Sequence, residues 1–219
     1  MNRYLVHVWD LPVRLFHWLL VIAIPFSWWS AEEGGVMLKY HMWCGYTIFG
    51  LVLFRLGWGF LGTRYARFAD FVHGPRRMFA AFGELFDRRP LAVPGHNPLG
   101  GWMVVLMLLV LAVQVGSGLF ANDDLFNEGP LYALVGKDAS DRLTALHHFN
   151  FSLLSGLIVV HVAAIAWHRV RKGEHLVRAM VTGRKQLPAP ATPLARVSVW
   201  RPLVLAAASA AIVAAVVKL

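Results

Sequence analysis

The chain has 219 residues, of which 58% are hydrophobic and only 15% are charged, and its formal net charge is +9. Soluble domains carry about 25% charged residues, so the composition excludes a soluble globular protein and indicates a membrane protein. The single cysteine, Cys44, excludes a disulfide framework, and the sequence has no C-x-x-C-H motif for covalent haem attachment.

Five apolar segments follow one another along the chain, at residues 14–31, 41–61, 99–120, 147–168 and 202–218. The first four are long enough to cross a hydrocarbon core about 30 Å thick. The fifth is shorter and rich in Ala and Val, so its alternative is an interfacial or packed helix. We therefore expect an all-α fold: a transmembrane four-helix bundle over 1–170, then a basic linker and a fifth C-terminal transmembrane helix over 171–219. A surface helix is expected at 75–87.

Basic side chains gather in alternate connections between these segments. The connection 62–98 holds six arginines, and 169–201 holds eight Arg and Lys residues. The connections 32–40 and 121–146 together hold seven acidic residues and three basic ones. Because cytoplasmic loops carry the excess of Arg and Lys, we predict a cytoplasmic N-terminus. The positive charge then serves topology and lipid headgroups, which excludes nucleic acid as its partner.

Two histidines of the fourth segment, His147 and His161, are fourteen residues apart. In an α-helix this spacing leaves the side chains about 40° apart around the axis and about 21 Å apart along it. One face therefore presents imidazoles near both boundaries of the hydrocarbon core, where ionisable side chains are costly and usually functional. His148 serves as a control, because its helical position turns it about 140° away from His161. His168 is in phase with His161 but lies about 10 Å further out.

Two more histidines match these depths. His17, at the cytoplasmic start of the first segment, matches His161, and His41, at the outer start of the second, matches His147. Two imidazoles per iron make a low-spin electron-transfer haem with no open position. We therefore predict that these four histidines are the iron ligands of two non-covalently bound haems. For each histidine taken alone, the alternative is an interfacial polar residue. Small residues that could admit a haem are Gly45, Gly116, Gly118 and Gly156.

Two arginines are candidates for pairing with haem propionates, and no catalytic residue is predicted. Arg55 lies inside the second segment, and Arg14 lies one turn before His17. A buried cation at this depth is suited to a propionate. The alternative is a side chain that extends along the lipid to reach the headgroups.

Four sequence stretches together resemble the bacterial cytochrome b561 family, which includes the cytochrome b subunits of nickel–iron hydrogenases. They are VWDLPVRLFHW, HMWCGYTIFGLVLFRLGWGFLG, RFADFVHGP and LHHFNFSLLSGLIVVH, and the resemblance covers residues 5–170. It implies a four-helix bundle that binds two b haems through histidines of helices one, two and four. It also implies electron exchange between quinone and periplasmic redox proteins. The matching positions are His17, His41, His147 and His161. His148 departs from the family, many members of which have Glu there.

Three classes of function follow. The first is a transmembrane electron-transfer cytochrome, with quinone reacting near the cytoplasmic haem and a c-type cytochrome or hydrogenase-like protein meeting the outer haem. The acidic outer connections favour a basic partner. The alternative, which the resemblance also suggests, is a superoxide oxidase (superoxide:quinone oxidoreductase), although an acidic face opposes the approach of an anion. A haem-free scaffold or transporter leaves the phase and depth of the histidines unexplained.

Overall fold

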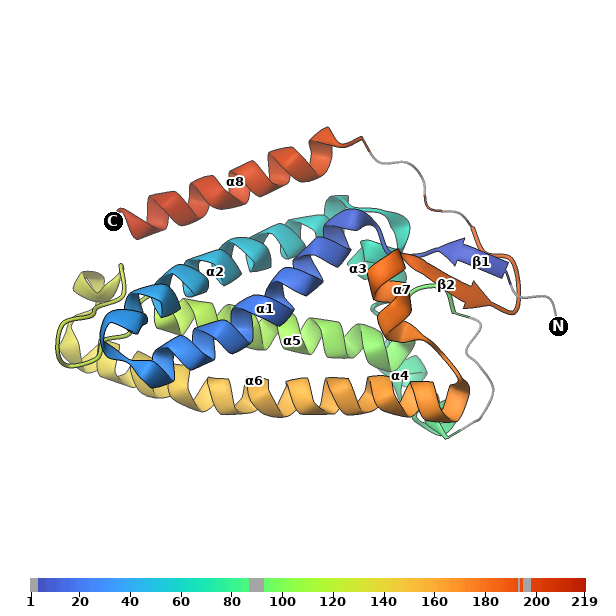
Figure 1. Cartoon of the computed structure of the whole chain (residues 1–219), viewed down its shortest axis with the longest axis horizontal. Coiled ribbons are helices and arrows are strands. Elements are labelled where there is room, and N and C mark those ends of the chain that lie inside the picture. Colours follow the sequence, from blue (N-terminus) through green and yellow to red (C-terminus); the bar gives the residue numbers. More distant parts are fainter. Residues whose placement is uncertain (1–3, 87–92, 193, 195–197) are drawn as a thin grey trace. The chain divides into compact units, whose positions relative to one another are not determined.

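The computed structural model describes residues 4–86, 93–192, 194 and 198–219, and its regular structure is almost entirely helical (Figure 1). Within these residues, five helices are long and apolar enough to cross a membrane. They are α1 (Leu11–Glu33), α2 (Leu38–Leu61), α5 (Pro98–Gly118), α6 (Lys137–Lys172) and α8 (Trp200–Val217). The predicted all-α transmembrane fold with a fifth C-terminal helix is confirmed.

The shorter elements lie between these helices. They are the helices α3 (Phe68–Phe71), α4 (Pro75–Leu85) and α7 (Leu176–Thr182), the 3-10 turns Gly35–Met37, Arg64–Ala66 and Tyr132–Leu134, and the strands β1 (Tyr4–His7) and β2 (Arg184–Leu187). Helix α4 is the surface helix that we predicted. The two strands pair antiparallel, with Tyr4 opposite Leu187 and His7 opposite Arg184. The sequence did not predict this small sheet.

Helix α6 begins at Lys137, ten residues before the apolar segment that we expected to start at 147. Its first turns are polar but well anchored. Asp138 lies in the first turn, where a carboxylate complements the positive end of the helix dipole. Ser140 donates a hydrogen bond to the carbonyl oxygen of Phe120 at 2.6 Å, and the backbone N–H of Asn122 donates to the hydroxyl of Thr144 at 3.1 Å. His147 therefore lies well inside the helix and not at its end.

The chain divides into two compact units. The first unit comprises residues 1–15, 56–106 and 157–202, and the second comprises 16–55, 107–156 and 203–219. The first unit contains the sheet, α3, α4 and α7, and the second contains His17, His41 and His147. We describe each unit separately.

A buried carboxylate organises the first unit. Asp10 is 8% exposed, and its Oδ1 accepts a hydrogen bond from the backbone N–H of Val13 at 2.8 Å, which caps the start of α1. Its Oδ2 accepts from the indole N–H of Trp58 at 3.0 Å and from the hydroxyl of Thr63 at 2.6 Å. Trp58 is completely buried. One carboxylate thus joins the start of α1 to the end of α2.

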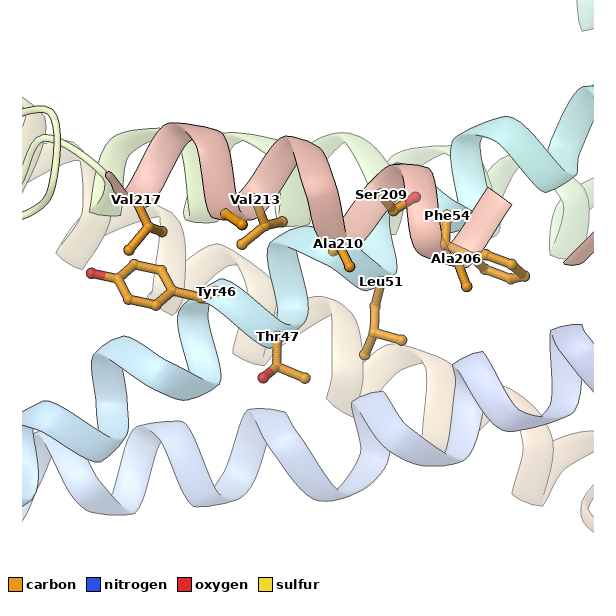
Figure 2. A pocket seen from close by; sticks show the side chains of 11 residues that line it. Tyr46, Thr47, Leu51, Phe54, Ala206, Ser209, Ala210, Val213 and Val217 are labelled. Atoms are coloured by element: carbon orange, nitrogen blue, oxygen red, sulfur yellow. The ribbon is translucent and has the colours of Figure 1, made fainter. Parts of the chain in front are cut away.

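In the second unit, α8 lies alongside α2 (Figure 2). A groove of about 450 Å³ runs between them, lined on the α2 side by Tyr46, Thr47 and Phe54 and on the α8 side mainly by Ala and Val. A Cβ atom on Gly50 would lie 3.6 Å from Val213, an ordinary van der Waals distance. Ser209 satisfies its hydroxyl within α8 by donating to the carbonyl oxygen of Leu205. Small residues therefore form the contact between the fifth helix and the second, as is common between membrane helices.

Candidate functional site

The site centres on His41, near the start of α2 in the second unit. Helix α1 ends at Glu33, and the chain reverses through Gly34 and Gly35, whose φ angles of 61° and 52° suit glycine. This reversal brings His41 against Ser27 of α1, whose carbonyl oxygen lies 2.9 Å from the Nδ1 atom of His41. A carbonyl can only accept, so Nδ1 carries the proton. The lone pair of the neutral imidazole is therefore on Nε2.

His147 of α6 is oriented in the same way by α5. Its Nδ1 lies 2.9 Å from the carbonyl oxygen of Gln114, and the hydroxyl of Ser117 is 3.3 Å from the same atom. The proton is again on Nδ1 and the lone pair on Nε2. A metal-binding histidine typically donates its other N–H to such a carbonyl, which fixes the tautomer and the direction of the ring.

The two imidazoles form a pair of the right size for one iron atom. The ring centroids of His41 and His147 are 6.0 Å apart, and the ring planes are at 84° to each other. Two metal–imidazole bonds of about 2 Å, each with about 1 Å from nitrogen to ring centre, would place the centroids about 6 Å apart. The distance and the tautomers therefore fit a haem held between α2 and α6.

Three of the predicted glycines of this unit are open where a Cβ atom would lie. A Cβ atom added at Gly45, Gly116 or Gly156 would meet nothing within 4 Å. Gly118 has a different role, because its Cβ would lie 2.9 Å from Cε1 of His147 and 3.1 Å from Nδ1. The absence of a side chain at Gly118 lets the His147 ring lie directly against α5.

A network of side-chain amides inside the membrane-spanning helices completes the surroundings of His147. The Nδ2 atom of Asn150 donates to Oε1 of Gln114 at 2.7 Å and to the carbonyl oxygen of Val110 at 2.9 Å. The Nε2 atom of Gln114 lies 3.1 Å from Nε2 of His147. A single lone pair cannot serve both this amide and an iron atom, so haem binding requires the Gln114 side chain to turn aside. Sequence reasoning missed this network, although a Gln and an Asn within apolar spans were the available signal.

The remaining histidines differ in their burial and in their contacts. His17 lies on α1 in the second unit and His161 on α6 in the first, both partly buried, and their pairing stays a prediction. His148 is exposed, in agreement with its predicted direction away from the ligand face. His168 is buried, and its Nδ1 lies within hydrogen-bond distance of Oε2 of Glu174, at 3.1 Å. Lys185 joins that pair from β2, and burial lowers the pKa of its amine although Glu174 acts in the opposite direction.

The two arginines differ in their surroundings. Arg55 is only 2% exposed, so its side chain does not extend along the surface towards headgroups. Arg14 donates from Nε to the carbonyl oxygen of Met180 at 3.2 Å and from Nη2 to that of Val181. These contacts supply a donor to carbonyl groups in the last turn of α7. Sequence reasoning did not anticipate these contacts. Pairing with a propionate stays a prediction for both arginines.

The acidic residues of the segment 121–146 are less available than their number suggested. Asp123 uses its carboxylate within its own loop, where hydrogen bonds, first of all from the side chain of Asn127, lower its pKa from 3.8 to about 2. Asp124 and Asp141 both pair with Lys137. Only part of the expected negative surface is therefore free to attract a partner.

Comparisons with known proteins agree with this geometry. A family model of the prokaryotic cytochrome b561 matches residues 8–183. Similar proteins include the probable Ni/Fe-hydrogenase B-type cytochrome subunits of Azotobacter vinelandii, 26% identical over 81% of this chain and 87% of the relative, and of Bradyrhizobium diazoefficiens, 23% identical over 84% and 87%. The probable Ni/Fe-hydrogenase 1 B-type cytochrome subunit of Escherichia coli K12 is 23% identical over 81% and 89%. No solved structure matches the chain significantly. The chain therefore belongs to the prokaryotic cytochrome b561 family, as a haem b-binding, multi-pass bacterial membrane protein of electron transfer.

Proposed function

We propose that the protein carries electrons across the bacterial inner membrane through two b haems. His41 and His147 would hold the outer haem, and His17 and His161 the cytoplasmic one. Quinone would exchange electrons on the cytoplasmic side, and a periplasmic redox protein would do so on the outer side. The names of the relatives favour a hydrogenase-like protein as that partner, and a c-type cytochrome is the other form that a periplasmic donor or acceptor commonly takes.

The observation that carries this proposal is the pair His41 and His147. The two rings come from different helices, their centroids are 6.0 Å apart, and Nδ1 of each lies 2.9 Å from a backbone carbonyl oxygen, which leaves Nε2 to bind a metal. The haem would supply the one-electron couple of its iron. His41 and His147 would both be ligands of the iron, which would leave no position for a substrate. This arrangement favours electron transfer over chemistry at the iron.

Haem content after single substitutions tests the assignment. Purified protein should contain two low-spin b haems per chain by the pyridine haemochrome assay. His41→Ala or His147→Ala should remove one haem, and His17→Ala or His161→Ala should remove the other. His148→Ala is the matched control, because its exposed ring points away, and it should keep both. One haem per chain in the unmodified protein, or haem loss in the control alone, would contradict the ligand set.

Orientation requires a separate test. A reporter inserted beside Arg76 and Arg77 should read out as cytoplasmic, and one inserted within 121–146 as periplasmic, because basic connections remain inside. The opposite result at both positions would exchange the quinone side and the partner side. A reporter after Leu219 examines α8 alone and should be periplasmic.

A further inference from the structure

The connection between α5 and α6 contains a tightly closed loop at residues 122–128. A β-bridge between Asn122 and Glu128 closes its base. Inside it, Oδ1 of Asp123 accepts hydrogen bonds from the backbone N–H groups of Leu125, Phe126 and Asn127 at 2.8–3.0 Å. Oδ2 of Asp123 accepts from the side chain of Asn127 at 2.6 Å. One carboxylate therefore satisfies three successive backbone N–H groups of the turn.

The loop is also fixed to the start of α6. The Nδ2 atom of Asn122 donates to the hydroxyl of Ser140 at 2.6 Å and to Oδ1 of Asp141 at 2.9 Å. Lys137 lies between Asp124 and Asp141 and pairs with both. Asp124 has a φ angle of 60°, and it is the only non-glycine residue with a positive φ in the described part of the chain. The backbone is thus held in one conformation by contacts at its base and within the turn.

The tip of this rigid loop is apolar. Leu125 is 77% exposed and Phe126 is 94% exposed, the highest value among the large hydrophobic residues that the structure describes. Interface hot spots are commonly aromatic side chains, surrounded by groups that contribute less. An anchor that is already ordered also loses little conformational entropy on binding. A loop that uses a network of polar contacts to present two apolar side chains has the properties of such an anchor.

We propose that Leu125 and Phe126 form the docking anchor for the outer partner protein, entering an apolar socket bordered by basic residues on that protein. The anchor rests on the proposed function in one respect, that the partner is the redox protein that exchanges electrons with the outer haem. The loop belongs to the same compact unit as His41 and His147.

Charge favours a protein over a lipid surface as the occupant. Asp124, directly before the tip, has a side chain that is 72% exposed, and Glu128 follows closely. Asp123 keeps its charge at physiological pH, because its hydrogen bonds lower its pKa to about 2. Lys137 is the one cation that contacts this group of carboxylates in the described structure, and it is already shared by Asp124 and Asp141. Anionic headgroups would be repelled here, whereas a basic rim on a partner would be attracted.

Site-specific photocrosslinking in living cells tests the anchor directly. Phe126→p-benzoyl-phenylalanine would be introduced in the full chain, expressed together with its neighbouring genes, and Leu134→p-benzoyl-phenylalanine would be the matched control. Leu134 belongs to the same connection and is 68% exposed. We expect position 126, and not 134, to form an adduct with a periplasmic protein that carries a haem or metal cluster. An adduct with lipid alone, equal adducts at both positions, or none at 126 would overturn the proposal.

A kinetic measurement gives a second, independent outcome. Leu125→Ser with Phe126→Ser keeps the backbone N–H groups that Asp123 binds and leaves every charge unchanged. With a basic c-type cytochrome as the probe, stopped-flow electron exchange should have an association rate at least tenfold lower in this double variant, with an unchanged salt dependence. Leu134→Ser should stay within twofold of the unmodified protein. Equal rates in the double variant and the unmodified protein would contradict the anchor. If the unmodified protein lacks haem or does not exchange electrons, the proposed function is contradicted instead. The crosslinking result would then decide on the anchor alone.

Discussion

Gly118 allows the closest approach to the candidate ligands, and replacing it with alanine is the most direct test of the outer haem site. The new Cβ atom would lie 2.9 Å from Cε1 of His147, whereas ordinary contact begins at 3.4 Å. The ring must therefore move by about 0.5 Å, the difference between these two distances. Its Nδ1 would move relative to the carbonyl oxygen of Gln114, which now lies at 2.9 Å.

The size of the effect follows from that contact. Loss of the orienting hydrogen bond of a metal ligand typically lowers metal affinity about 10- to 100-fold. We expect Gly118→Ala to weaken binding of the outer haem by this factor and to leave the other haem in place. Gly83→Ala in α4, outside the candidate site, is the matched control, because its Cβ would meet nothing within 4 Å and the same gain in helix propensity, about 0.5–1 kcal/mol, applies to both variants.

Haem content by pyridine haemochrome and redox titration of each haem would measure the difference between the two glycine variants. Gly118→Ala should lower the haem content towards one per chain on dilution, and Gly83→Ala should not. In a His147→Ala background, Gly118→Ala should have no further effect, since the ring that it displaces is absent. Full haem content and an unchanged outer potential in Gly118→Ala would refute the placement of His147 against α5.

Three further predictions concern other features. An iron held between the rings of His41 and His147, which are at 84° to each other, would have nearly degenerate dπ orbitals, so EPR should show a strongly anisotropic low-spin signal that is lost in His41→Ala; a rhombic signal with three well-resolved g values would contradict perpendicular rings. Asp10→Ala removes a helix cap and leaves two buried donors without their acceptor, so it should cost about 2–4 kcal/mol in thermal unfolding, and Asp10→Asn less; equal stability in all three proteins would contradict the role of Asp10. The pKa of Asp123 is lowered to about 2, so its stabilisation of the loop should be complete above about pH 4 and disappear as the pH falls to 2. Pepsin should therefore cleave Asp123→Asn faster than the unmodified protein at Leu125–Phe126 at pH 4, and this difference should be absent at pH 2. A difference in cleavage that does not change with pH would contradict the role of Asp123.

The spans could be predicted, and a ligand face could be proposed, because both depend on local, periodic properties. Hydropathy over twenty residues locates a membrane helix whatever its neighbours are. The fourteen-residue spacing fixes the direction of His147 relative to His161 in any regular helix, and the exposure of His148 agrees with it. These predictions needed no knowledge of how the helices pack.

Contacts between distant segments could not be predicted. The β1–β2 pairing joins two four-residue strands from opposite ends of the sequence, each too short to show a period. The polar start of α6 was missed because hydropathy identifies the apolar part of a helix and not its water-exposed extension. A count of the acidic residues in the connection 121–146 also overestimated how many carboxylates are available to a partner. The geometry of the turn commits the Asp123 carboxylate to backbone donors.

The pairing of β1 with β2 has a consequence for how the chain is divided. The strands flank the region from residue 8 to residue 183 that matches the family model, so this sheet brings the two ends of that region together. The chain therefore leaves the family core beside the point where it entered. Any segment that follows Leu187 is attached outside this closure, and α8 is one such addition. This addition is still in contact with the core, because α8 packs on α2, the helix that carries His41.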